Sequence, residues 1–144
     1  MDDKKYEARL TTYSQPKLLG LATKHFNAFI RERDKNDGCI SCGIRHTSRW
    51  EAGHYFNAGK VKCLRFHEQN VNKQCHKCNY HMHGNESGYR VGLVRKYGEE
   101  AVKQLEFKAA WEKRHPGLKH IDRWLLIDVI IKYRRHSECK QQRN

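Results

Sequence analysis

The stretch CISCGIRHTSRWEAGHYFNAGKVKCLRF, residues 39–66, begins with a Cys-x-x-Cys pair, Cys39 and Cys42. A second pair of the same spacing, Cys75 and Cys78, follows after 32 intervening residues. Two such pairs are typical of a tetrahedral site in which four thiolates close around one zinc ion and leave no open position. The sequence therefore predicts a structural zinc ion that cannot itself activate water. The alternative is four reduced cysteines packed as small apolar side chains.

The composition narrows the choice of partner and compartment. The 144 residues include 29 Lys and Arg against 16 Asp and Glu, which gives a formal net charge of +13. This charge favours a polyanionic partner, and we expect DNA rather than a membrane, because no apolar run approaches the roughly 20 residues of a spanning helix. No secretory signal is recognisable, so we expect a cytoplasmic protein whose cysteines bind metal rather than form disulfides.

The first third of the chain predicts an arm followed by a helix. Residues 1–13 are polar and are expected to form an N-terminal arm. Residues 14–34 offer Ser14 at a capping position and Pro16 in the first turn of a helix. Apolar side chains then recur at helical spacing, which predicts a buried face: Leu18, Ala22, Phe26, Phe29 and Ile30.

A two-stranded ribbon is expected next, which makes the predicted fold class α+β. Residues 49–56 and 60–66 are rich in aromatic and β-branched side chains and are joined through a turn containing Asn57 and Gly59. Residues 70–85 have few core side chains and suggest a zinc knuckle that leads into a short helix ending near Gly84. Three further helices are predicted at residues 89–97, 99–115 and 120–136.

The C-terminal segment, residues 108–144, carries ten basic and four acidic side chains and has a net charge of +6. Its last predicted helix is apolar around much of its girth, which is typical of burial on more than one side. That helix can pack on the helix at 14–34 or form a homodimer through the C-terminal helices. We divide the chain into the arm, a core with its leading helix at 14–107, and these basic helices.

His54, Asn70 and Asn79 follow one another through the ribbon and the knuckle. With the motifs NAFIRERD, CISCG, EAGHY, LRF, KQC, and CN followed by H and GN, this order resembles the NinG (Rap) family of lambdoid phage recombination endonucleases. That family is placed in the HNH, or ββα-metal, nuclease superfamily. The similar region runs from about Asn27 to Glu106. The resemblance implies a small zinc-stapled HNH core with flanking helices that cuts branched DNA, such as a Holliday junction or a D-loop.

The resemblance also implies a role for each of the three side chains. His54 corresponds to the general base, and a neutral imidazole can accept a proton from water at cellular pH. Asn70 matches the asparagine that orients this base across the ribbon. Asn79 matches a ligand of the catalytic cation, for which Mg²⁺ or Mn²⁺ is expected in addition to the structural zinc.

The second ligand of the catalytic cation stays open. Gly53 stands where many HNH nucleases carry an acidic or histidine ligand directly before the base. His83 would share a helical face with Asn79, while His81 sits at the position that the resemblance favours. Glu51 would reach the site only across a bulge, because residues three apart on a regular strand face opposite sides.

Other basic and titratable residues are assigned to the surface. Contacts to backbone phosphates are expected from four residues: Lys60, Lys62, Arg65 and Lys73. His76 is expected to face solvent, because it lies inside a cysteine knuckle. Two rival functions remain: an HNH nuclease of restriction or homing type that cuts linear duplex, and a zinc-ribbon module that binds DNA without cutting it.

Overall fold

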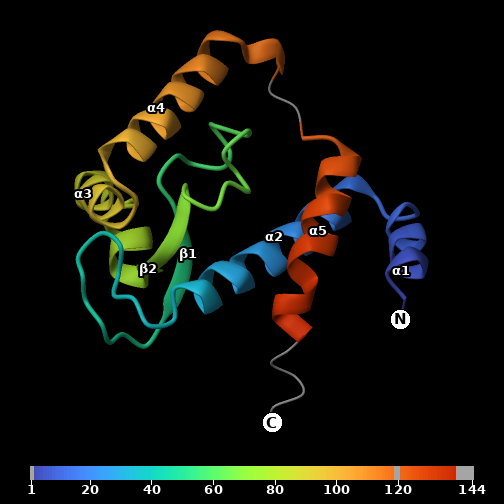
Figure 1. Ribbon diagram of the computed structural model, residues 1–144, viewed down its shortest axis with the longest axis horizontal. Coiled ribbons are helices and arrows are strands. Elements are labelled where there is room, and N and C mark those ends of the chain that lie inside the picture. Colours follow the sequence, from blue (N-terminus) through green and yellow to red (C-terminus); the bar gives the residue numbers. More distant parts are fainter. Residues whose placement is uncertain (1, 119–120, 139–144) are drawn as a thin grey trace.

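Two antiparallel strands form the sheet of this α+β fold. The computed structural model describes residues 2–118 and 121–138 and pairs β1 (Trp50–His54) with β2 (Val71–Cys75). The register runs without a bulge from Trp50 opposite Cys75 to His54 opposite Val71. Figure 1 shows the sheet between α2 on one side and α3 with α4 on the other.

The prediction of the second strand at residues 60–66 is wrong. That segment forms a series of turns, and β2 lies in the stretch that the sequence suggested was only a knuckle. All five residues of β2 are buried, although Asn72, Lys73 and Gln74 are polar. Their side-chain nitrogens donate hydrogen bonds within the structure, which makes this burial possible. An apolar pattern cannot reveal such a strand.

The largest apolar core lies between α2 (Gln15–Arg33) and α5 (Arg123–Glu138), which cross in the right-hand half of Figure 1. The rings of Phe26 and Tyr133 meet edge to face, with centroids 5.1 Å apart. Four residues of α2 are fully buried at the predicted spacing: Leu18, Ala22, Phe26 and Ile30. The last helix therefore packs on the helix at 14–34 within the chain.

Part of α5 remains free for other contacts. Trp124 and Leu125 are exposed at the beginning of the helix. A homodimer through the C-terminal helices stays a prediction. Residues 119–120 and 139–144 of the predicted C-terminal segment lie outside the described residues.

The segment predicted as a polar arm forms helix α1 (Asp3–Leu10), which is a correction to that prediction. Leu10 is fully buried in the core formed by α2 and α5. Asp3 pairs with Arg134 of α5, whose guanidinium also lies 4.3 Å from the centroid of the Tyr6 ring. One buried leucine and a few contacts to α5 thus hold a helix whose composition is polar.

A second, smaller core forms where α3 (Glu86–Tyr97) and α4 (Glu99–Arg114) pack beside the ribbon. Gly98 separates the two helices with a φ of 88°, as its position predicted. A Cβ at Gly92 would lie 1.8 Å from the carbonyl oxygen of Ile40, so α3 approaches the first cysteine knuckle closely. Two short helices complete the fold: the π-helix η1 (Lys77–His81) and the 3₁₀-helix η2 (Pro116–Leu118).

No helix among the described residues combines the length and apolar composition that crossing a membrane requires.

Candidate functional site

The four cysteines of the two pairs come together and could hold a zinc ion. The sulfur atoms of Cys39, Cys42, Cys75 and Cys78 all lie within 4.8 Å of one another. The Sγ atoms of Cys42 and Cys75 are 3.8 Å apart. A tetrahedral site with Zn–S bonds of about 2.3 Å has sulfur atoms about 3.8 Å apart. The donor set and its size therefore fit zinc, with three of the cysteines buried and Cys42 exposed.

The surroundings of these sulfur atoms explain why a cation would stabilise them. Burial raises the pKa of the Cys78 thiol to about 12, although Asn85 donates a hydrogen bond to it at 3.4 Å. Burial also raises the pKa of Cys39, but backbone N–H groups, including that of Cys75, outweigh this effect and lower it overall. Four thiolates this close repel one another, so a bound cation is required to hold all four deprotonated.

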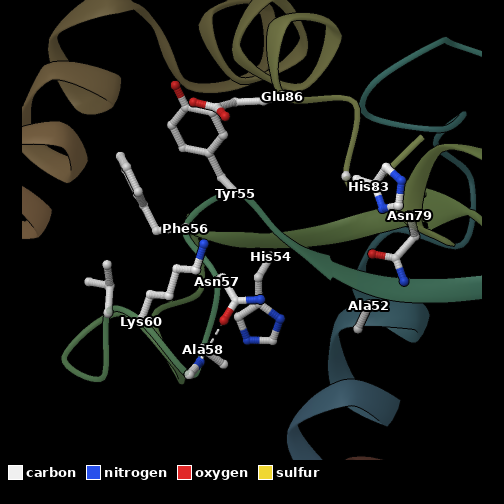
Figure 2. A pocket seen from close by; sticks show the side chains of 13 residues that line it. Ala52, His54, Tyr55, Phe56, Asn57, Ala58, Lys60, Asn79, His83 and Glu86 are labelled. Carbon is white, nitrogen blue, oxygen red and sulfur yellow. Dashed lines mark hydrogen bonds between the residues drawn. The ribbon is translucent and has the colours of Figure 1, made fainter. Parts of the chain in front are cut away.

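The cysteine cluster adjoins a cavity of 690 Å³, shown in Figure 2. Asn79 connects the two, because it follows Cys78 directly on η1 and lines the cavity. Thirteen residues from β1, the loop after it, η1 and the start of α3 form the lining: Ala52, His54, Tyr55, Phe56, Asn57, Ala58, Gly59, Lys60, Val61, Asn79, His83, Gly84 and Glu86.

His54 is held at the end of β1 in a single tautomer. Its Nε2 lies 2.9 Å from the carbonyl oxygen of Arg65. A carbonyl oxygen only accepts, so Nε2 donates and the lone pair of the neutral ring is on Nδ1. Burial lowers the pKa of His54, and the hydrogen bond to Arg65 offsets this effect only in part. His54 can therefore accept a proton at Nδ1 in the cellular pH range.

Asn79 presents its amide at the same cavity. Its Nδ2 donates to Oε2 of Glu51, and Figure 2 shows its amide oxygen turned towards the side on which His54 lies. Oε1 of Glu51 accepts from Nδ1 of His76 at 2.6 Å and pairs with Nε of Arg49 at 3.0 Å. Burial raises the pKa of Glu51, but the hydrogen bonds from His76 and Asn79 outweigh it and lower the pKa overall.

The structure explains the glycine that precedes His54. A Cβ at Gly53 would lie 2.0 Å from Oε1 of Gln74, and the carbonyl oxygen of Gly53 accepts from the hydroxyl of Tyr89 at 2.6 Å. A ligand side chain at this position would displace the side chain of Gln74. Glu51 also lies on a strand without a bulge, so its side chain leaves β1 on the face opposite that of His54.

Of the two histidines left open as the second ligand, His83 lies at the cavity. It lines the same wall as Asn79, with a φ of 50°. His81 is exposed and contacts the rings of His76 and Tyr80 instead. The position that the resemblance favours is therefore the one further from the cavity.

Asn70 does not hydrogen-bond to His54 in the described structure. Its fully buried amide accepts from the N–H of Phe56 at 2.8 Å and donates to the carbonyl oxygens of Phe56 and Leu64 at 3.1 and 3.0 Å. Asn70 thus holds the loop that leads to Arg65, whose carbonyl oxygen binds His54. Any effect on the histidine is indirect.

The residues expected to contact phosphates lie in different environments. Lys60 is exposed on the cavity wall, Lys62 is exposed beside it, and Arg65 is half-buried. The prediction for Lys73 is wrong, because its residue is buried and its Nζ donates to the carbonyl oxygen of Lys35 at 3.1 Å. The expectation that His76 faces solvent is also corrected, since it is half-buried against Glu51.

Glu112 is a structural residue of the site that the sequence did not reveal. Its buried carboxylate accepts from the backbone N–H groups of Lys62 and Cys63 at 2.8 and 2.7 Å. It therefore anchors the loop between the strands from α4. A separation of 50 residues along the chain left no pattern from which this contact could be inferred.

Comparison with known proteins gives a family and several relatives. A family model described as "Bacteriophage Lambda NinG protein" matches residues 3–141. "Protein ninG" of Escherichia phage lambda is 48% identical over 124 residues, which cover 85% of this chain and 56% of the relative. "Protein ninG" of Escherichia phage 933W is 40% identical over 124 residues, covering 85% and 57%. The protein of that name from Salmonella phage P22 is 46% identical over 94 residues, covering 65% and 45%.

The chain thus spans about half the length of the relatives it matches. No solved structure matches it.

Proposed function

The chain belongs to the NinG family of lambdoid phage proteins, and from this premise we propose that it is a metal-dependent DNA endonuclease of the HNH type. One observation carries the proposal. A single cavity is lined by the imidazole of His54 and the amide of Asn79, which lie on a strand and a helix joined through the cysteine cluster. The formal net charge of +13 supplies attraction to the phosphate backbone.

Each side chain has a defined task in phosphodiester hydrolysis. Nδ1 of His54 takes the proton from the attacking water, while the Arg65 carbonyl holds the ring. The amide oxygen of Asn79, with His83 beside it, would hold Mg²⁺ or Mn²⁺. The chemistry that such a cation supplies is neutralisation of charge on the phosphate and on the leaving oxygen. Zinc at the four cysteines would hold β2 and η1 in place without joining the reaction.

We further propose that the substrate is a branched recombination intermediate of the Holliday junction or D-loop type. The family resemblance supports this choice, and a homodimer would suit it by presenting two cavities to two strands. The rival functions are cleavage of linear duplex by a restriction or homing type of HNH nuclease, and DNA binding by a zinc-ribbon module without cleavage.

The test compares wild type, His54→Ala and His46→Ala on a four-way junction and on a matched linear duplex. His46 is an exposed histidine and serves as the control. With Mg²⁺ or Mn²⁺, His54→Ala should cleave the junction about 10² to 10⁴ times more slowly, because a positioned general base contributes this much. DNA affinity and zinc content should stay at the wild-type values, and chelation of the cation should stop cleavage.

The proposal fails if His54→Ala cuts the junction at the wild-type rate under saturating cation. Equal cleavage of junction and duplex by wild type would instead support the restriction or homing type. DNA binding without cleavage under any of these conditions would support the zinc-ribbon module.

A further inference from the structure

The side-chain amide of Asn79 can face the cavity in two ways. Its oxygen and its NH₂ group have similar sizes, and a half-turn about the last side-chain bond exchanges them. Only the oxygen can bind a cation such as Mg²⁺ or Mn²⁺, whereas the NH₂ group would repel it. The cation site proposed above therefore depends on which end of this amide faces the cavity.

Glu51 decides that orientation. Its carboxylate has acceptors only, so it favours the amide nitrogen of Asn79, which donates to its Oε2. The amide oxygen is then left facing the cavity, as Figure 2 shows. In the reversed orientation two oxygens would face each other, and the hydrogen bond would be lost.

Glu51 is itself held by two further partners, His76 and Arg49. Its side chain is only 20% exposed, and its Oε1 contacts Nδ1 of His76 and Nε of Arg49 at 2.6 and 3.0 Å. His76 lies between Cys75 and Cys78, so the cysteine knuckle anchors this carboxylate. The described residues that line the cavity do not include Glu51, which separates its position from the reacting groups.

We propose that Glu51 is a positioning residue that holds the Asn79 amide with its oxygen towards the cation. This proposal rests on the proposed function of Asn79 as a cation ligand. It gives Glu51 a role different from that of a direct ligand, because its side chain leaves β1 on the face opposite His54 and is not among the described residues that line the cavity.

The experiment measures Mn²⁺ binding to the full, zinc-loaded chain by electron paramagnetic resonance, in the absence of DNA. Glu51→Ala should weaken Mn²⁺ binding about 10- to 100-fold, the usual effect of losing a partner that orients a metal ligand. The Mn²⁺ concentration for half-maximal cleavage should rise by the same factor, and excess Mn²⁺ should recover the rate. Glu99→Ala removes an exposed carboxylate on α4 and should change neither value.

Glu51→Gln is the conservative variant. Its amide oxygen can accept from Asn79, and its NH₂ group can donate to Nδ1 of His76 once that ring adopts the other neutral tautomer, so Mn²⁺ binding should stay close to the wild-type value. This variant also keeps the test valid if Glu51→Ala fails to retain zinc. In an Asn79→Ala background, Glu51→Gln and Glu51→Ala should bind Mn²⁺ equally, because the residue to be positioned is gone.

Wild-type Mn²⁺ binding by folded Glu51→Ala would overturn the proposal. Equal losses in Glu51→Ala and Glu51→Gln would also overturn it, because charge rather than orientation would then explain the effect. If wild type binds no Mn²⁺ and cuts no DNA, the proposed function fails first. If wild type does both and only the Glu51 results differ from expectation, the positioning role alone is wrong.

Discussion

The protein contains two buried regions with opposite chemistry. Between α2 and α5, the buried side chains are apolar and the largest contacts are between aromatic rings. Around β2, three cysteines are buried together with several polar side chains: Asp34, Asn70, Asn72, Lys73 and Gln74. The first region is stabilised by removal of apolar surface from water, which needs no defined partner. The second is stabilised by specific hydrogen bonds, and its four clustered cysteines could add the bonds of a zinc ion.

This difference determines how each region responds to a change. An apolar core tolerates imperfect packing and loses stability in proportion to the volume removed. In a polar core, removal of one side chain leaves its former hydrogen-bond partners buried and unsatisfied. The loss of stability therefore extends to the whole hydrogen-bond network. The candidate active site belongs to the polar region, and its side chains depend on that region for their orientation.

The largest effect is expected from Cys78→Ser. Zinc binding contributes roughly 10 to 16 kcal/mol to small zinc domains, and serine is a poor replacement for a thiolate ligand. We expect this variant to lose zinc and to be unfolded or aggregated, as measured by zinc content per chain and circular dichroism. Cys63→Ser changes an exposed cysteine outside the cluster and should behave as wild type. If Cys78→Ser is soluble and its thermal stability is unchanged, folding does not depend on zinc.

Phe26→Ala should have the next largest effect, on the apolar region alone. Removal of this fully buried ring should lower the free energy of unfolding by about 3 to 5 kcal/mol while zinc content stays unchanged. Urea denaturation of zinc-loaded protein measures this change in the free energy of unfolding. Phe107→Ala, at a ring that is 64% exposed, is the matched control. Loss of zinc from folded Phe26→Ala would mean that the two regions are not separable.

Asn70→Ala should have a smaller effect on stability but should also disturb the candidate site. It leaves the N–H of Phe56 and two carbonyl oxygens without their side-chain partner, which costs about 1 to 3 kcal/mol. Cleavage should slow as well, because the loop leading to the Arg65 carbonyl loses its support. Asn36→Ala, at an exposed asparagine, should change neither. A cleavage rate equal to wild type would show that the loop holds His54 without Asn70.

The smallest expected effect is a shift in the pH dependence of cleavage. In the proposed reaction the neutral form of His54 is the base, so the rate should rise with pH through the pKa of this residue. Burial lowers that pKa below 6.5, and the midpoint of the acid side should therefore lie below 6.5. Single-turnover rates under saturating Mn²⁺ measure the midpoint, with circular dichroism as the control for folding at each pH. A midpoint at or above 6.5 would contradict the lowering of the pKa by partial burial of His54.

Part of this fold could be predicted from the spacing of residues along the chain. Helix α2 and its buried face, the break at Gly98 and the clustering of the four cysteines all follow from spacing along the chain. The second strand did not, because β2 is polar and is buried through hydrogen bonds rather than through apolar surface. The first helix was missed for a similar reason, since its composition is polar and Leu10 alone is buried.

For the candidate site, the sequence by itself determined the residue types: four cysteines, a histidine and an asparagine at a spacing suited to metal and base. Tertiary structure decided which atoms of these residues are available. The lone pair of His54 is on Nδ1 because a carbonyl 11 residues away binds the other ring nitrogen. The oxygen of Asn79 faces the cavity because Glu51, 28 residues earlier, holds its nitrogen. Such hydrogen bonds join segments distant in the chain, so no local pattern encodes them, and only the folded backbone brings the partners together.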